Sequence, residues 1–380
     1  MIQQPVQFNV DDRPEFFKEL RKRVNHHFKE NNKSRNANAS MVIKTIFMIT
    51  LYFTPWILML TEVVTGVWPT IGMWTLMGFG MAGIGLSIMH DANHGSYSKN
   101  KTVNWALGYL VNFLGAYHSN WKIQHNVLHH SFTNVDGHDE DIAKDGVMRF
   151  SPTQERKPFF KYQIFYAPFL YGIMTIYWFM AKDFQQAIRY HKKDLLKTQG
   201  LTKTTAILEL IFNKAWYLGG FLALPIIMIS TVAWWQTVLG FLLMHFICGL
   251  ILAFIFQPAH VINETSFYVP DENNSVENNW AIHQLHTTAN FANGSRWFSW
   301  LIGGLNFQIE HHLFPNICHV HYRDISKIVK ATAEEFDVPY YRHGSFFDAL
   351  RSHFSLLHSL GTGAYDKKEK TENKQQLVAA

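Results

Sequence analysis

Histidine side chains in this 380-residue chain gather in three short clusters that could bind metal ions. Two clusters contain a pair of histidines spaced i,i+4, which places both rings of a pair on one helix face. The second cluster adds an adjacent histidine, turned about 100° away around the helix. The third is an amide followed by histidines at i+3 and i+4. In chain order the candidate ligands are His90, His94, His125, His129, His130, Gln308, His311 and His312.

A further candidate ligand, His260, lies just beyond the last long apolar run. With it the chain offers eight imidazoles, more than the roughly four to six positions of one first-row ion. Two metal ions are therefore the simplest interpretation, and no catalytic residue is expected beyond their ligands. Imidazole suits iron, zinc, copper or nickel, so the ligands alone leave the metal open. Of the other histidines, His283 is the strongest additional candidate, because Asn279 precedes it by four residues.

Other sequence features narrow the chemistry. The sequence has no H-E-x-x-H motif of a zinc hydrolase, and no glutamate is followed three residues later by histidine, as in di-iron helix bundles. The two cysteines are distant from each other and cannot form a C-x-x-C site. Acidic residues after the second cluster could orient the imidazoles by accepting their outer N–H groups, or could form a solvated loop. These residues are Asp136, Asp139, Glu140 and Asp141.

Long apolar runs must position these clusters. Charged residues make up 17% of the chain, below the roughly 25% of soluble proteins. Four apolar runs are interpreted as membrane-spanning helices: residues 46–64, 68–89, 215–230 and 232–256. The net charge of +5 is carried beside these runs instead of in an aromatic-rich patch, so no nucleic-acid partner is expected.

The apolar run at residues 159–180 decides the topology. If the three clusters form one site, an even number of spans must separate them, and residues 215–256 already supply two. Placing 159–180 in the membrane interface also keeps the following lysine-rich loop on the inner side, as the positive-inside tendency favours. The run at 103–117 is too short to cross and is expected to be interfacial. Four spans therefore place all clusters on one membrane face.

The remaining segments complete the expected architecture. Residues 1–40 form a polar segment, with an amphipathic helix at about 12–29 expected on the membrane surface. Residues 41–345 form the membrane domain, and residues 346–380 a C-terminal helix and a disordered tail. The fold class is an all-α integral membrane protein with four transmembrane helices, interfacial helices and a cytoplasmic helical cap that holds a di-metal histidine site.

Nitrogen ligands beside a hydrocarbon phase favour oxidation of an apolar substrate, because removing hydrogen from an unactivated C–H bond requires a metal. Residues 297–307, aromatic and apolar, directly precede the third cluster. They could form an apolar slot against the metals, or an interfacial helix.

The three clusters resemble the histidine boxes of membrane fatty-acid desaturases. They read His90-Asp91-Ala92-Asn93-His94, then His125 to His130, then Gly303 to Pro315, and the resemblance runs from about residue 40 to 345. Gln308 stands where many desaturases have histidine, which is the pattern of the front-end group with delta-5 and delta-6 enzymes and linoleoyl-CoA desaturase-like bacterial proteins. An amide is a poorer ligand than imidazole, so Gln308 would coordinate weakly or hydrogen-bond to a water at the metal.

This resemblance implies two iron ions, O2 as co-substrate, and a fatty acyl-CoA or acyl-lipid substrate that gains a cis double bond. It also implies a ligand at the end of the last span, which His260 matches. The His-Pro-Gly-Gly tetrapeptide of a fused cytochrome-b5-type domain is absent. Electrons are therefore expected from a separate ferredoxin, or from a cytochrome-b5-type protein with its reductase. The active site is expected on the cytoplasmic face of a bacterial plasma membrane.

Two alternatives remain at this point. A hydroxylase of alkane, sterol or carotenoid type uses similar histidine boxes, and would leave a new oxygen in the product instead of a double bond. A membrane metal transporter would place its ligands near the bilayer midplane, whereas these clusters lie at the ends of the predicted spans.

Overall fold

Helices dominate the computed structural model, which describes residues 6–143 and 146–367. The α-helices are α1 (Glu15–Glu30), α2 (Ala39–Leu60), α3 (Val67–Gly83), α4 (Met89–Asn93), α5 (Lys101–Gly108), α6 (His118–Lys122), α7 (Gln163–Gly172), α8 (Met174–Tyr177), α9 (Asp183–Lys192), α10 (Lys203–Leu218), α11 (Leu224–Met228), α12 (Trp234–His260), α13 (Trp280–Thr287), α14 (Arg296–Leu301), α15 (Gln308–Leu313), α16 (Tyr322–Glu335) and α17 (Phe346–Thr362). The π-helical turns are η1 (Ile84–Ile88), η3 (Ile123–His129), η5 (Trp178–Lys182) and η7 (Gly219–Ala223). The 3-10 turns are η2 (Tyr109–Leu114), η4 (Pro158–Tyr162), η6 (Leu195–Gln199) and η8 (His319–His321).

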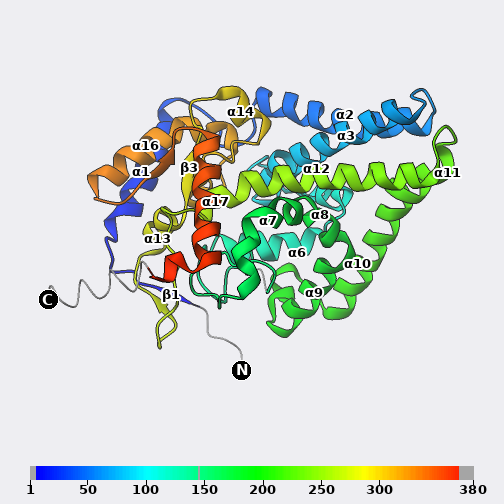
Figure 1. Cartoon of the computed structure of the whole chain (residues 1–380). Helices are drawn as coiled ribbons and strands as arrows, with labels where there is room; N and C mark the ends of the chain where they lie inside the picture. Colours follow the sequence, from blue (N-terminus) through cyan, green and yellow to red (C-terminus); the bar gives the residue numbers. More distant parts are fainter. Residues whose placement is uncertain (1–5, 144–145, 368–380) are drawn as a thin grey trace.

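Four stretches of the described chain are long and apolar enough to cross a membrane, as the sequence predicts. They are Ala39–Leu60, Val67–Asn93, Lys203–Met228 and Trp234–His260. The third begins well before the apolar run at 215–230, because polar residues of α10 continue the same helix. Figure 1 shows α2, α3 and α12 running side by side, with α11 meeting α12 at the end far from α1 and α16.

The segment around residues 159–180 is not a straight helix. Pro158–Gly172 and Met174–Lys192 meet at a bend of 59°. A fifth span would require this bent pair to count as one crossing, so the interfacial placement of the segment stays a prediction. The run at 103–117 forms the short elements α5 and η2, in agreement with the expectation that it does not cross.

Small residues let the spans approach closely. A Cβ atom built on Gly80 of α3 would lie 2.7 Å from the Tyr52 backbone nitrogen of α2. One built on Gly78 would lie 2.9 Å from the Met244 carbonyl oxygen of α12. Helix α3 is thus held between its two neighbours by glycine contacts, which is how helices associate where lipid provides no hydrophobic force between them. Because α3 continues into η1 and α4, this packing fixes the position of His90.

Beyond the spans, a helical cap is formed by α1, α13, α15 and α16 around a common apolar core. The apolar face of α1, which includes Phe16, Leu20 and Val24, is fully buried in this core. The amphipathic helix is therefore confirmed, but the expectation that its apolar face lies on the membrane surface is wrong. In Figure 1, α1 and α16 lie together at one end of the molecule.

Short parallel strands tie distant segments to this cap. Strand β1 (Gln7–Phe8) pairs with β2 (Ser275–Val276). Strand β3 (Ala289–Phe291) pairs with β4 (Tyr341–His343). Helix α17 then packs back on α12. The tail beyond residue 367, for which the sequence predicts disorder, lies outside the described residues.

Candidate metal centre

All the candidate histidines come from helix ends or short helical turns that meet where the spans join the cap. His90 belongs to α4 and His94 follows it, while His125 and His129 lie in η3. His260 ends α12, and the third cluster lies in α15. The loop before α15 presses against the backbone of η1 at Gly303, where a Cβ atom would overlap the Leu86 carbonyl oxygen. Gly303 also has a φ of +67°, a conformation that glycine adopts without strain.

The second cluster is arranged differently from the prediction. The segment Ile123–His129 is a π-helix, and the His130 amide donates to the His125 carbonyl oxygen at 3.0 Å. Because a π-helix has more residues per turn, a residue at i+5 is rotated less from residue i than it would be in an α-helix. The His130 ring therefore does not turn away, and its Nε2 atom lies 3.2 Å from His125 Nε2. Such π-helical turns occur often at functional sites.

The ring nitrogens converge on a small volume. The Nε2 atoms of His90 and His125 are 3.1 Å apart, and those of His130 and His311 are 2.9 Å apart. The histidines fall into three sets, and within each set the ligand atoms all lie within 4.8 Å of one another. The sets are His90, His94, His125 and His311; His129, His260 and His312; and His130, His311 and His312. The structure thus brings together every histidine that the sequence singled out as a ligand.

Outer hydrogen bonds fix the orientation of several rings. The His129 Nδ1–H donates to the Asp139 carboxylate at 3.1 Å, and the His312 Nδ1–H donates to Gln284 Oε1 at 2.8 Å. The His260 Nδ1–H donates to the Thr287 carbonyl oxygen at 3.1 Å. A ring that donates from Nδ1 directs the lone pair of Nε2 toward the common volume.

Several inward-facing atoms have no hydrogen-bond partner in the part of the chain that the structure describes. His94 Nε2, His260 Nε2 and His312 Nε2 are such atoms. Both amide atoms of Gln308 are also buried without a partner. Buried polar atoms almost always have a hydrogen-bond partner. These unpartnered nitrogen and oxygen atoms therefore fit the ligands of a bound cation.

Burial and neighbouring imidazoles hold these rings in the neutral form. Desolvation is the largest cause and the other site histidines add to it, so that the pKa lies well below its ordinary value for His94, His125, His130, His311 and His312. Neutral imidazole is the form that binds a metal. The donor set is nitrogen-rich, buried and ready for cations without prior loss of protons.

The sequence predicted only some of the residues that hydrogen-bond to the outer nitrogens of the histidine rings. Asp139, one of the four acidic residues after the second cluster, does orient an imidazole, whereas Glu140 pairs with Arg189. Nothing in the sequence pointed to Gln284, or to Tyr322, whose hydroxyl lies 3.2 Å from His311 Nδ1. These residues lie outside the histidine clusters in the sequence, so no short motif there indicates the contact.

His283 lies outside the candidate sets. Its Nε2–H donates to the Thr133 carbonyl oxygen at 2.7 Å, and its ring packs against Phe8 and Tyr268. The neighbouring Gln284, not His283, faces the centre. This histidine connects strand β1 and the loop after the second cluster to α13.

Glu310, which precedes His311 in α15, anchors this helix through its carboxylate. Its two carboxyl oxygens accept hydrogen bonds from Asn290 Nδ2 at 2.8 Å and from the Tyr340 hydroxyl at 2.9 Å. Burial raises the pKa of Glu310 to about 7. Through these contacts strand β3 and the segment before β4 hold the third cluster in place.

A second buried cluster lies beside the centre. His319 Nδ1–H donates to Asp91 Oδ2 at 2.7 Å, and Lys44 Nζ donates to His319 Nε2 at 2.7 Å. Asp91, Cys318 and His319 also have ligand atoms within 4.8 Å of one another. Both ring nitrogens of His319 are therefore already engaged, Nδ1 by the Asp91 carboxylate and Nε2 by the Lys44 ammonium.

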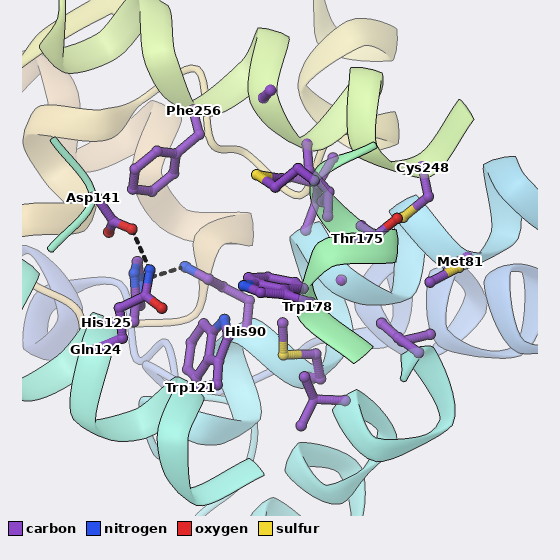
Figure 2. Close-up of a pocket in the computed structure, with 18 of the residues that line it drawn as sticks. Met81, His90, Trp121, Gln124, His125, Asp141, Thr175, Trp178, Cys248 and Phe256 are labelled. Atoms are coloured by element: carbon purple, nitrogen blue, oxygen red, sulfur yellow. Dashed lines mark hydrogen bonds between the residues drawn. The ribbon is translucent and has the colours of Figure 1, made fainter. Parts of the chain in front are cut away.

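An elongated cavity leads from the centre into the space between the spans. Among its lining residues, His90, Gln124, His125 and Asp141 lie at the polar end, and Met81 and Cys248 lie at the far end (Figure 2). Figure 2 shows His90, His125 and Trp121 at one end, with Trp178 and Thr175 toward the other. The walls are mostly methionine, leucine, valine and aromatic side chains from α3, η2, η5 and α12. Such a cavity suits a linear hydrocarbon chain with one segment held against the histidines.

Comparison with known proteins gives consistent matches. Residues 65–344 match the sequence profile described as "Fatty acid desaturase". The chain is 34% identical over 349 residues to the sn-1 linoleoyl-lipid 6-desaturase of Synechocystis sp., covering 91% of this chain and 95% of that protein. It is 36% identical to the enzyme of the same name from Arthrospira platensis, covering 90% and 91%. It is also 36% identical to the acyl-lipid (8-3)-desaturase of Physcomitrium patens, covering 91% and 72%.

Proposed function

Because this chain belongs to the fatty acid desaturase family, we propose that it introduces a cis double bond at carbon 6 of a linoleoyl chain esterified to a membrane lipid. Its general activity is that of an oxidoreductase that forms double bonds in fatty acids. The 6-position and the lipid-bound substrate are supported by the printed names of the two cyanobacterial relatives, which match nearly the whole chain. The family match does not favour the hydroxylase alternative.

The proposed cofactor is a pair of iron ions. One would be held by His90, His94, His125 and His311, and the other by His129, His260 and His312. His130 faces both sets, and Gln308 adds an unpartnered amide. Bound iron would supply the oxidising power that removes hydrogen from an unactivated C–H bond in the presence of O2.

The chain's own residues bind and orient the substrate. The apolar walls between Met81 and Leu252 would hold the acyl chain extended and exclude water from the reacting carbons. His90 and His125 line the same cavity, so one methylene pair would lie directly beside the centre. The convergence of the histidines at the polar end of an apolar cavity is the observation that carries the proposal.

The proposed location is a bacterial plasma membrane, with the centre on the cytoplasmic side. The basic residues between Lys182 and Lys214 support this orientation, because positive loops stay on the inner side. The proposed electron source is a separate ferredoxin, or a cytochrome-b5-type protein with its reductase.

Expression in a host that lacks polyunsaturated acids, fed with linoleate, tests the function. The intact protein should give an octadecatrienoate with its new double bond at carbon 6, found by gas chromatography and mass spectrometry. A product that gains one oxygen atom would instead identify a hydroxylase. If the intact protein and a His129→Ala variant give the same fatty-acid profile in a competent host, the proposal fails.

A further inference from the structure

The reaction needs a source of two electrons. Reduction of O2 to two waters consumes four electrons and four protons, and forming one double bond releases two of each from the acyl chain. On the proposed function, therefore, two electrons and two protons must come from outside. We propose that a groove on α1 docks an acidic one-electron carrier protein, and that Phe17 and Trp280 lead from this groove to His130. Two reduced carriers would be oxidised in each turnover.

The docking groove is cationic. Among the described residues that line it, three are basic and none is acidic. Its lining is Pro14, Phe17, Lys18, Arg21, Lys22, Asn25 and Asn279. The side chains of Lys18 and Lys22 are 76% and 77% exposed. Each forms an ion pair with a glutamate on the same helix, but such exposed pairs are weak and can open for a partner.

The floor of the groove lies close to the metal centre. The Phe17 ring packs edge-on against Trp280, with 5.5 Å between ring centroids. The Trp280 indole N–H donates to the His130 carbonyl oxygen at 3.2 Å, and His130 Nε2 is 2.9 Å from His311 Nε2. Two aromatic rings and one hydrogen bond thus connect the groove with a proposed ligand. Electron tunnelling slows steeply with distance, which favours a carrier that docks at such a place.

The charge and the packing of α1 together indicate which kind of molecule docks in the groove. A helix that binds a lipid surface inserts its apolar face, but the apolar face of α1 is buried against α16. The side chains of α1 that line the groove are mostly polar and basic. Electrostatic complementarity steers an acidic protein to such a surface. An acidic one-electron carrier is therefore the occupant that fits, rather than an anionic membrane.

Charge reversal in the groove tests the docking step. The variant Lys18→Glu/Arg21→Glu/Lys22→Glu is compared with Lys327→Glu/Lys330→Glu/Arg342→Glu, which makes the same change in charge on exposed basic residues elsewhere. Iron-loaded protein, in nanodiscs of phosphatidylcholine with and without phosphatidylglycerol, is supplied with reduced [2Fe–2S] ferredoxin at increasing concentration. Double-bond formation is then measured, with a second series driven by reduced methyl viologen.

We expect the groove variant to raise the KM for ferredoxin at least tenfold, while the viologen-driven rate and the control variant stay near the intact values. An unchanged KM overturns the docking site. If the variant loses activity equally with both reductants, and only in discs that contain phosphatidylglycerol, the groove binds lipid and the carrier proposal is wrong. If the intact protein forms no double bond with either reductant, the proposed function fails first, and with it the reason for a carrier.

A Trp280→Phe variant tests the route. It keeps a ring against Phe17 but removes the N–H that donates to His130. The rate of reduction by saturating ferredoxin is divided by the rate with methyl viologen, so that any loss of iron cancels. A ratio that falls severalfold supports the route, and an unchanged ratio contradicts it.

Discussion

Two neighbouring clusters in this molecule have ligand-like spacing, yet they differ in charge. In the histidine centre, neutral rings direct unpartnered nitrogens into a shared volume. In the cluster of Asp91, Cys318 and His319, both ring nitrogens of His319 have partners, and the Lys44 ammonium contacts Nε2 at 2.7 Å. The first cluster offers unpartnered nitrogens to a cation, and the second contains a cation of its own in Lys44. Distances alone would identify both clusters as metal sites, whereas the hydrogen-bond partners of their ligand atoms distinguish one from the other.

The largest effect is expected from removing a ring of the centre. His312→Ala should lower double-bond formation by at least about 100-fold and reduce the iron content, because a ligand is lost outright. Activity and iron per chain are measured on the purified protein. An exposed histidine provides the matched control, since His26→Ala should change neither quantity. Normal iron binding by His312→Ala would show that this ring is no ligand.

A smaller loss of metal affinity and activity is expected when a residue that orients a ligand ring is changed. Asp139→Asn keeps the side-chain shape but weakens the acceptor for His129 Nδ1–H. Metal affinity or activity should fall about 10- to 100-fold, as for other outer partners of ligating histidines. Competition with a chelator measures the affinity. Unchanged metal affinity would mean that Asp139 serves only the fold.

The second cluster should respond in stability instead of in metal content. Lys44→Met removes the donor to a fully buried ring nitrogen, which costs about 1–3 kcal/mol of unfolding free energy. Iron per chain should stay at the intact value. Unfolding by a denaturing detergent and metal analysis of the same sample check both parts. Loss of iron in this variant would contradict the division between the two clusters.

The smallest effect is expected at Gln308. Its amide is buried without a protein partner among the described residues, but an amide is a weaker ligand than imidazole. Gln308→Ala should keep the iron content and lower activity by less than about tenfold. Iron analysis and product yield measure this. Loss of one iron per chain would establish Gln308 as a direct ligand.

Much of the site could be predicted from the sequence because its signals are local. The i,i+4 histidine pairs and the long apolar runs each appear within one helix, and the structure contains both. The position of His130 was missed because a π-helix changes the residues per turn without an evident sequence signal. The partners Gln284 and Tyr322 were missed because they lie far from their histidines in the chain. The apolar stripe of α1 did not reveal whether lipid or α16 would cover it.

The most direct test of the central claim is the iron content of the purified intact protein, measured by mass spectrometry. A centre of two metal sites built from eight histidines predicts two iron ions per chain. One ion per chain, or two zinc ions in a protein that is fully active without iron, would contradict it.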